Sequence, residues 1–227
     1  MNNILSIFML TACTQALGAS AMKLESSPHA FVPAPYVVVE KIQGDLNGDG
    51  VSDAVLLIQD TDKTKFFKHE FRGELDRNRR GIVVALGGTH GYQLVTKNLK
   101  CFSSDNEDGG VYYAPELSLS IVKGTLRIHY AHGRYGYWTY IFRLQNADFE
   151  LIGFDSSEDH GPVVERFISI NLLTQKMRVK HNVNTNARGG DEKFVERWQH
   201  FTLTQPIKLS EIKDFDGFDV EDLIHTR

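Results

Sequence analysis

The sequence predicts an all-β fold that is mainly antiparallel, and two observations carry that prediction. Apolar and polar residues alternate in six successive runs of the second half of the chain, which is typical of strands with one buried and one wet face. Short turns rich in Gly, Asn and Asp separate several of these runs, as in neighbouring antiparallel strands. We therefore expect a meander that forms a twisted sheet, a sandwich, or an incomplete barrel or propeller-like arrangement.

Composition limits the class of protein. At 227 residues, with 41% hydrophobic and 24% charged residues, the chain is long enough for one well-cored soluble domain. Its formal net charge of −4 arises from acids and bases spread along the chain, which provides no field that would gather nucleic acid. We expect no nucleic-acid partner.

Residues 1–21 have the features of a signal peptide. The apolar run Ile4–Leu10 is too short to span a bilayer but suits a signal-peptide core. Leu10–Cys13 fits a lipobox, in which Cys13 would be lipidated, whereas Ala19–Ala21 fits ordinary cleavage. We favour the lipobox, because the apolar run ends at the cysteine. The expected product is a periplasmic or outer-membrane lipoprotein that meets a membrane only through its lipid anchor.

Residues 22–35 are expected to form an extended linker and residues 36–209 the β-rich domain. The linker contains three prolines among small residues and shows no periodicity. The runs at 36–42 and 54–59 are rich in β-branched residues and predict the first two strands, the second of them covered on both faces. The charged segment 60–80 is predicted to be a long surface excursion.

The remaining strands are predicted as successive hairpins. Residues 81–86 and 92–96 are expected to pair across a five-residue Gly-rich connection. The alternating strands are then expected at 117–121, 126–130, 138–144, 149–154, 167–172 and 177–183. Residues 191–204 fit a helix or a strand, and the preceding meander favours the strand. The acidic residues 210–227 are expected to form a C-terminal tail, as a short helix or without order.

One loop carries a metal-binding pattern. Oxygen-bearing side chains occupy alternate positions from residue 45 to residue 49 and again at residue 53, and Gly50 lies where the turn is sharp. Calcium takes about six to eight oxygen ligands, and a chain that curls around the ion presents every second side chain to it. The expected Ca²⁺ ligands are Asp45, Asn47, Asp49, Val51 through its backbone carbonyl, and Asp53.

This loop differs from a helix–loop–helix calcium hand. Its twelfth position is Leu56 instead of a bidentate Glu, so Asp53 would close the ligand shell and a strand would follow. That ligand set indicates weak binding, with a dissociation constant of about 10⁻⁵ to 10⁻³ M. The alternative is a plain Asx/Gly turn between two strands, because Asn-Gly and Asp-Gly are strong hairpin signals.

The run Gly44–Leu57 resembles the Asp-rich calcium loops of FG-GAP and VCBS repeats, the units of integrin-type β-propellers. More broadly, the order of this loop and the runs Arg79–Leu86, Tyr140–Gln145 and Phe149–Phe154 is similar to exported bacterial proteins and lipoproteins that carry one such loop. The resemblance implies export and a β fold, and it implies no particular activity.

Other residues support weaker hypotheses. Tyr135, Tyr137 and Trp138 are possible ligand-binding residues for a glycan or peptide, although aromatic strand residues more often pack in a core. Four histidines suggest zinc without the spacing of a zinc module: His129, His132, His160 and His181. Residues 103–110 and 214–219 are conceivable cation sites but more typical of solvated loops. Cys101 is expected to be a small buried hydrophobe.

The leading hypothesis is therefore an exported calcium-binding β domain without catalytic activity. It would act by binding an envelope or secreted protein, for example as an inhibitor- or immunity-type partner. The alternative is an envelope hydrolase of glycans or peptides that uses carboxylates or histidines near the aromatic strands. A pocket lined by Tyr137 and Trp138 that contains two carboxylates would favour this alternative.

Overall fold

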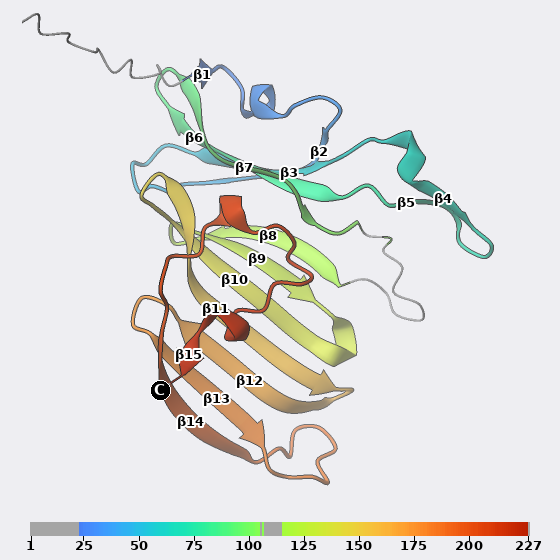
Figure 1. The fold of residues 1–227 in the computed structure, drawn as a ribbon, viewed down its shortest axis with the longest axis vertical. Coiled ribbons are helices and arrows are strands. Elements are labelled where there is room, and N and C mark those ends of the chain that lie inside the picture. Colours follow the sequence, from blue (N-terminus) through green and yellow to red (C-terminus); the bar gives the residue numbers. More distant parts are fainter. Residues whose placement is uncertain (1–22, 105, 107–114, 227) are drawn as a thin grey trace, which may run out of the picture.

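A computed structural model describes residues 23–104, 106 and 115–226. The predicted all-β fold is confirmed: the described residues form antiparallel strands and short 3₁₀ turns, with no α-helix among them (Figure 1). The chain builds a five-stranded sheet, an eight-stranded sheet that curls, and a two-stranded arm (Figure 1). This architecture is that of a sandwich or an incomplete barrel.

The five-stranded sheet has the strand order β1-β7-β6-β3-β2. Its strands are β1 (Leu24–Glu25), β2 (Val37–Gly44), β3 (Asp53–Gln59), β6 (Arg80–Gly88) and β7 (Gly91–Phe102). Strand β3 is central, and its residues from Asp53 to Ile58 are buried, which confirms the predicted doubly covered strand. Strands β6 and β7 form the predicted hairpin, but they extend to Gly88 and Gly91, so the connection is shorter than expected.

The N-terminal segment covers the outer face of this sheet instead of running as the extended linker expected for residues 22–35. Strand β1 pairs with β7, and a 3₁₀ turn, η1 (Pro28–Phe31), follows. The Ser27 hydroxyl caps this turn by accepting the N–H of His29 at 3.3 Å. Phe31 is buried in an apolar cluster with Leu56 and Ile58 of β3. An apolar outer face requires such a cover, because burial of its side chains stabilises the sheet.

The eight-stranded sheet confirms the predicted meander. Its order is β15-β14-β13-β12-β11-β10-β9-β8. The strands are β8 (Glu116–Val122), β9 (Thr125–Ala131), β10 (Gly136–Gln145), β11 (Asp148–His160), β12 (Val163–Asn171), β13 (Lys176–Asn182), β14 (Phe194–Thr202) and β15 (His225–Thr226). The ambiguous run 191–204 thus contains a strand, as predicted. Lys123 and Gly124 both adopt positive φ, which two-residue hairpin turns of this kind require.

The C-terminal segment closes the core, in contrast to the expected tail at residues 210–227. It lies across the hollow face of the curled sheet (Figure 1). Its buried apolar residues belong to the same cluster as the inner faces of both sheets: Leu209, Ile212, Phe215, Val220 and Ile224. The side-chain amide of Asn98 in β7 donates to the backbone oxygens of Leu209 and Ile212 at 2.8 and 2.7 Å. The domain therefore extends well beyond residue 209.

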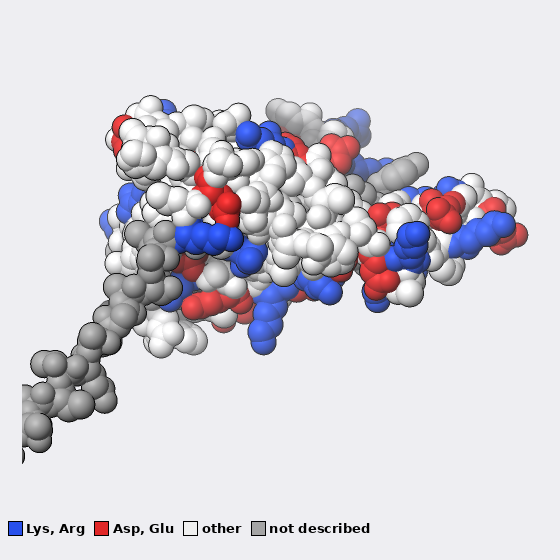
Figure 2. All heavy atoms as spheres, turned by 90° about the horizontal axis from the view of Figure 1, so that it is seen from above, with Lys and Arg blue, Asp and Glu red and all other residues white. Residues whose placement is uncertain are grey.

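The charged segment 60–80 projects from the domain as a two-stranded arm. It contains η2 (Lys63–Lys65), β4 (Phe66–His69) and β5 (Gly73–Asp76). Figure 2 shows Lys and Arg side chains interspersed with Asp and Glu along this projection. The arm thus carries charges of both signs on the face seen in Figure 2.

Candidate calcium loop and surface sites

The candidate calcium loop joins β2 to β3 at one edge of the five-stranded sheet. Leu46 is buried in the main core and fixes the start of the loop, whereas residues 47–52 are exposed. Gly48 and Gly50 adopt φ of +80° and +81°, a left-handed conformation that favours glycine. The two glycines therefore allow the chain to curl tightly between two paired strands.

Asp45 organises the turn from its inner side. One of its carboxylate oxygens accepts the N–H of Gly48 at 2.6 Å and the other accepts the N–H of Gly50 at 2.9 Å. These hydrogen bonds from Gly50 and Gly48 hold the pKa of the Asp45 carboxyl below its ordinary value, because they stabilise the charged form. Asp45 thus carries its negative charge throughout the neutral pH range.

Asn47 and Asp49 continue the same pattern along the loop. The Asn47 side-chain oxygen accepts the N–H of Asp49 at 3.0 Å, and Asp49 accepts the N–H of Val51 at 2.7 Å. The Asn47 amide also donates to the second oxygen of Asp49 at 2.9 Å. Three of the predicted ligand side chains therefore take part in one hydrogen-bonded loop.

Asp53 fastens the loop to the sheet, a role that its position in the sequence does not reveal. Its side chain is fully buried and accepts the N–H of Leu46 at 2.7 Å and the N–H of Gly87 in β6 at 2.8 Å. Burial, the largest influence, raises the pKa of Asp53, the two N–H donors oppose this, and the carboxylates of Asp49 and Asp45 raise it further. The carboxylates of Asp45 and Asp49 therefore lie close enough to repel that of Asp53.

The donor set suits calcium in its chemistry, but the carboxylates are not gathered around one point. Within the described residues, no group of three or more His, Cys, Asp or Glu side chains is arranged to hold a metal ion. Calcium also accepts amide and backbone carbonyl oxygens, which Asn47 and Val51 can supply. A carboxylate oxygen that accepts one N–H keeps another lone pair, so the hydrogen bonds and an ion do not exclude each other.

The structure separates Tyr137 from Trp138, whereas Tyr135 and Trp138 both lie against the ring of His132, with centroid distances of 5.1 and 6.0 Å. Tyr137 and Trp138 are neighbours in β10, so their side chains lie on opposite faces of the sheet. Trp138 stacks on Tyr130 of the inner face with ring centroids 5.3 Å apart, whereas Tyr137 contacts His129 at 5.5 Å. Tyr135, in the turn before β10, lies 5.1 Å from the ring of His132. Tyr137 and Trp138 therefore do not line one shared pocket.

The other candidates have ordinary structural surroundings. His129 shares a hydrogen bond of 2.8 Å with the Thr139 hydroxyl. Asp214 pairs with Arg79 at 2.7 Å, so it belongs to the packing of the C-terminal segment. Cys101 is buried and its pKa is raised by burial, which confirms the expected buried hydrophobe. Residues 105 and 107–110 of the second conceivable cation loop, and Cys13, lie outside the described residues.

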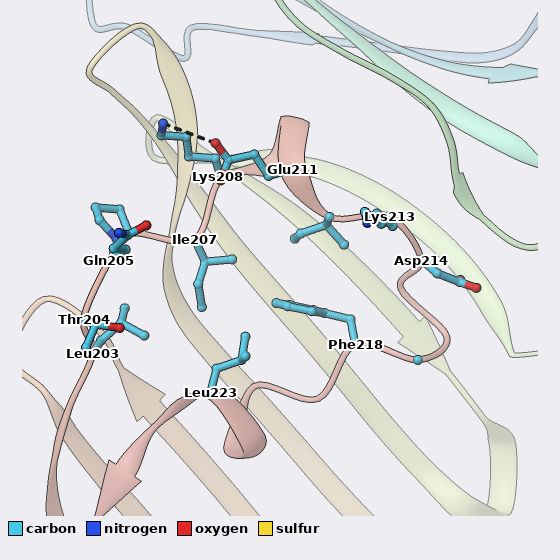
Figure 3. Close-up of a pocket in the computed structure, with 13 residues that line it drawn as sticks. Leu203, Thr204, Gln205, Ile207, Lys208, Glu211, Lys213, Asp214, Phe218 and Leu223 are labelled. Atoms are coloured by element: carbon cyan, nitrogen blue, oxygen red, sulfur yellow. Dashed lines mark hydrogen bonds and ion pairs between the residues drawn. The ribbon is translucent and has the colours of Figure 1, made fainter.

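A hollow of about 530 Å³ lies within the C-terminal segment (Figure 3). Ile207, Phe218 and Leu223 face one another across it, and Lys208 and Glu211, an ion pair at 3.4 Å, lie at its rim (Figure 3). The hollow is formed by the path of this one segment. Its apolar side chains continue the packing of Ile212 and Phe215 against the sheets.

Comparison with models of known families, with characterised proteins and with solved structures gives no match to this chain. The described residues include no helix that is both long and apolar enough to cross a bilayer.

Proposed function

We propose that this protein is an exported calcium-binding β domain without catalytic activity, which acts by binding another component of the cell envelope. The observation that carries the calcium part is the concentration of oxygen donors on the loop between β2 and β3. Asp45, Asn47 and Asp49 present side-chain oxygens within five consecutive residues, and Asp53 follows at the start of β3.

Electrostatics support a cation at this place. The carboxylates of Asp45 and Asp49 raise the pKa of Asp53 after the larger effect of burial, so the loop concentrates negative charge. No Lys or Arg in the described part of the chain forms an ion pair with these three residues. A divalent cation would relieve that repulsion. Asp45, Asn47, Asp49 and the carbonyl of Val51 would hold it, with Asp53 next to it.

The ion would act as a structural staple. Asp53 connects the loop to Gly87 in β6, so an ion held by the loop would fix β2, β3 and β6 relative to one another. Calcium at about fifty times its dissociation constant would add roughly 2 kcal/mol to the free energy of unfolding. For a chain of this size, that corresponds to a melting temperature about 4–8 °C higher.

The test compares the melting temperature in chelator and in millimolar calcium for two matched variants. Asp49→Asn keeps an oxygen that can accept the N–H of Val51 but removes the charge. Asp62→Asn makes the same change in another exposed turn, where Asp62 accepts the N–H of Thr64 at 2.9 Å. We expect calcium to stabilise the wild type and Asp62→Asn, and to lose its effect on Asp49→Asn. If calcium does not raise the melting temperature of the wild type, the proposal is wrong.

Export and lipidation form the second part of the proposal. They rest on the apolar run Ile4–Leu10 and the tetrapeptide that ends at Cys13. Mass spectrometry of the mature N-terminus separates the alternatives. A lipid-modified Cys13 supports the lipoprotein, whereas a mature chain that starts at Met22 shows ordinary cleavage after Ala21.

A further inference from the structure

Three cationic side chains share the outer face of strand β13. Lys176, Arg178 and Lys180 occupy alternate positions, so they point to the same side and follow one another at about 7 Å. Because their neighbours Met177 and Val179 are buried in the core, this side is the outer, convex face of the sheet. Like charges at this spacing repel one another unless anions offset them.

The residues around these cations offset only part of the charge. Lys180 pairs with Glu196 of β14 at 3.5 Å. Arg178 has no carboxylate opposite it, because its cross-strand neighbours are Ser169 and Trp198. Asp155 lies one strand further, opposite Ser169, with its Cα about 10 Å from the Cα of Arg178. It lines the same hollow as Arg178 and Lys180 and offsets a further part of their charge. The described residues thus leave a net positive strip along β13.

An exposed indole lies beside this strip and is oriented by a hydrogen bond and a cation–π contact. Trp198 is 61% exposed, although an aromatic ring of this size gains free energy by burial. Its Nε1–H donates to Glu196 at 2.7 Å, and the Arg178 guanidinium lies 5.8 Å from the ring centroid. An aromatic side chain has only two rotatable bonds, so it loses little conformational entropy when a ligand stacks on it.

Two hollows extend the strip in succession across the sheet. One, of about 350 Å³, is lined by Tyr137, Asp155, Phe167, Ile168, Ser169, Arg178 and Lys180. The other, of about 240 Å³, is lined by Lys176, Trp198, Gln199 and His200. Each combines cationic, hydroxyl or amide groups with an aromatic ring, which suits a polar ring that also has a C–H face.

We propose that this basic aromatic strip, defined as Lys176, Arg178, Lys180, Trp198 and Tyr137, binds an acidic polysaccharide. Carboxylates of successive sugar units pair with the cations of β13, Arg178 through its planar fork, and the C–H face of a pyranose ring stacks on Trp198. Successive carboxylate-bearing sugar rings would pair with the row of cations on β13 and occupy the two hollows. The inference rests on the binding role proposed above but not on calcium.

The experiment titrates the full mature chain with polygalacturonate in the presence of chelator, which removes any contribution from the calcium loop. The chain contains two tryptophans, so a Trp138→Phe background assigns the fluorescence to Trp198. We expect a saturable change of this signal with polygalacturonate, weaker at high salt, and none with neutral dextran. Isothermal titration gives the affinity of each variant, and circular dichroism verifies its fold.

The matched variants are Arg178→Gln and Arg197→Gln. Arg197 is exposed on the neighbouring strand, and its register with the buried Val179 places it on the opposite face. We expect Arg178→Gln and Trp198→Ala to weaken binding by about tenfold each and Arg197→Gln to leave it unchanged within about twofold. Any one of three results overturns the inference: no binding of polygalacturonate, equal loss in Arg197→Gln, or equally tight binding of poly-glutamate, which would indicate an acidic protein partner.

Discussion

The ring of Phe215 stacks on the ring of Phe102, with centroids 5.0 Å apart and an interplanar angle of 29°. Phe102 ends β7 of the five-stranded sheet, and Phe215 also contacts Tyr140 of the eight-stranded sheet at 5.0 Å. The backbone N–H of Phe215 donates to the carbonyl of Cys101 at 2.9 Å. One residue of the C-terminal segment therefore joins both sheets.

Replacement of this ring should strongly destabilise the domain. Phe215 is 2% exposed, so Phe215→Ala leaves a cavity between the two sheets and should lower the free energy of unfolding by about 3–5 kcal/mol. Leu223→Ala is the matched control, because Leu223 belongs to the same segment but is 41% exposed, and it should cost about 1 kcal/mol or less. Urea denaturation measures both values. If Phe215→Ala lowers the free energy of unfolding by no more than about 1 kcal/mol, as expected for Leu223→Ala, the segment is not part of the cooperative core.

The reactivity of the buried Cys101 thiol should depend on the packing of Phe215 against the end of β7. Burial raises its pKa, so the reactive thiolate is absent at mildly alkaline pH and the native protein should not react with a thiol reagent. In a Cys13→Ser background, labelling should begin only upon unfolding. Phe215→Ala should accelerate it under native conditions, because Phe215 covers the strand that carries Cys101. Rapid labelling of the native wild type would contradict the burial of this side chain.

The link between Asp53 and Gly87 gives a prediction that is independent of metal. In chelator, Asp53→Asn should lower the free energy of unfolding by about 1–3 kcal/mol, because one of the two backbone donors, on Leu46 or Gly87, loses its acceptor. Asp49→Asn should have a much smaller effect under the same conditions, since its turn is exposed. If the two variants unfold alike in urea, Asp53 does not fasten the loop to β6.

The lowered pKa of Asp62 should make the stability of the protein depend on pH. The hydroxyl and then the N–H of Thr64 donate to its carboxylate, which lowers its pKa below the ordinary value of 3.8. The folded state therefore binds the proton less tightly than the unfolded chain does. The stabilisation that the Asp62 carboxylate provides is present above the unfolded pKa of 3.8 and is lost as the pH falls through the lower, folded pKa. Denaturation of wild type and Asp62→Asn should give stabilities that differ most at neutral pH and converge as the pH falls below the ordinary value of 3.8. A constant difference at every pH would contradict the assignment.

The regular part of the fold could be predicted from the sequence because its signals are local. Alternation of apolar and polar residues, as in Leu126, Ile128 and Tyr130, depends on strand geometry alone. Short turns then make sequence neighbours into spatial neighbours, which gives the meander. Because adjacent residues of a strand point to opposite faces, the sequence also predicts that Tyr137 and Trp138 lie on different faces once both are placed in one strand.

The long-range contacts could not be predicted in this way. Phe215 and Val220 stand among acidic residues and glycine with no helical or strand period, so their burial depends on a concave surface that only the folded sheets provide. The contact of Asp53 with Gly87 depends on the pairing of β3 with β6. The cations of β13 alternate visibly in the sequence, but the position of Trp198 beside Arg178 comes from register.

The closure of the core by residues 209–224 also constrains when the protein can fold. Asn98 and Phe102 of the five-stranded sheet contact residues that follow more than a hundred positions later in the chain. A nascent chain that lacks residues 209–224 leaves inner-face rings such as those of Phe102 and Tyr140 without their contact to Phe215. We therefore expect stable folding only once residues 209–224 have been added to the growing chain, and dependence on chaperones before that point.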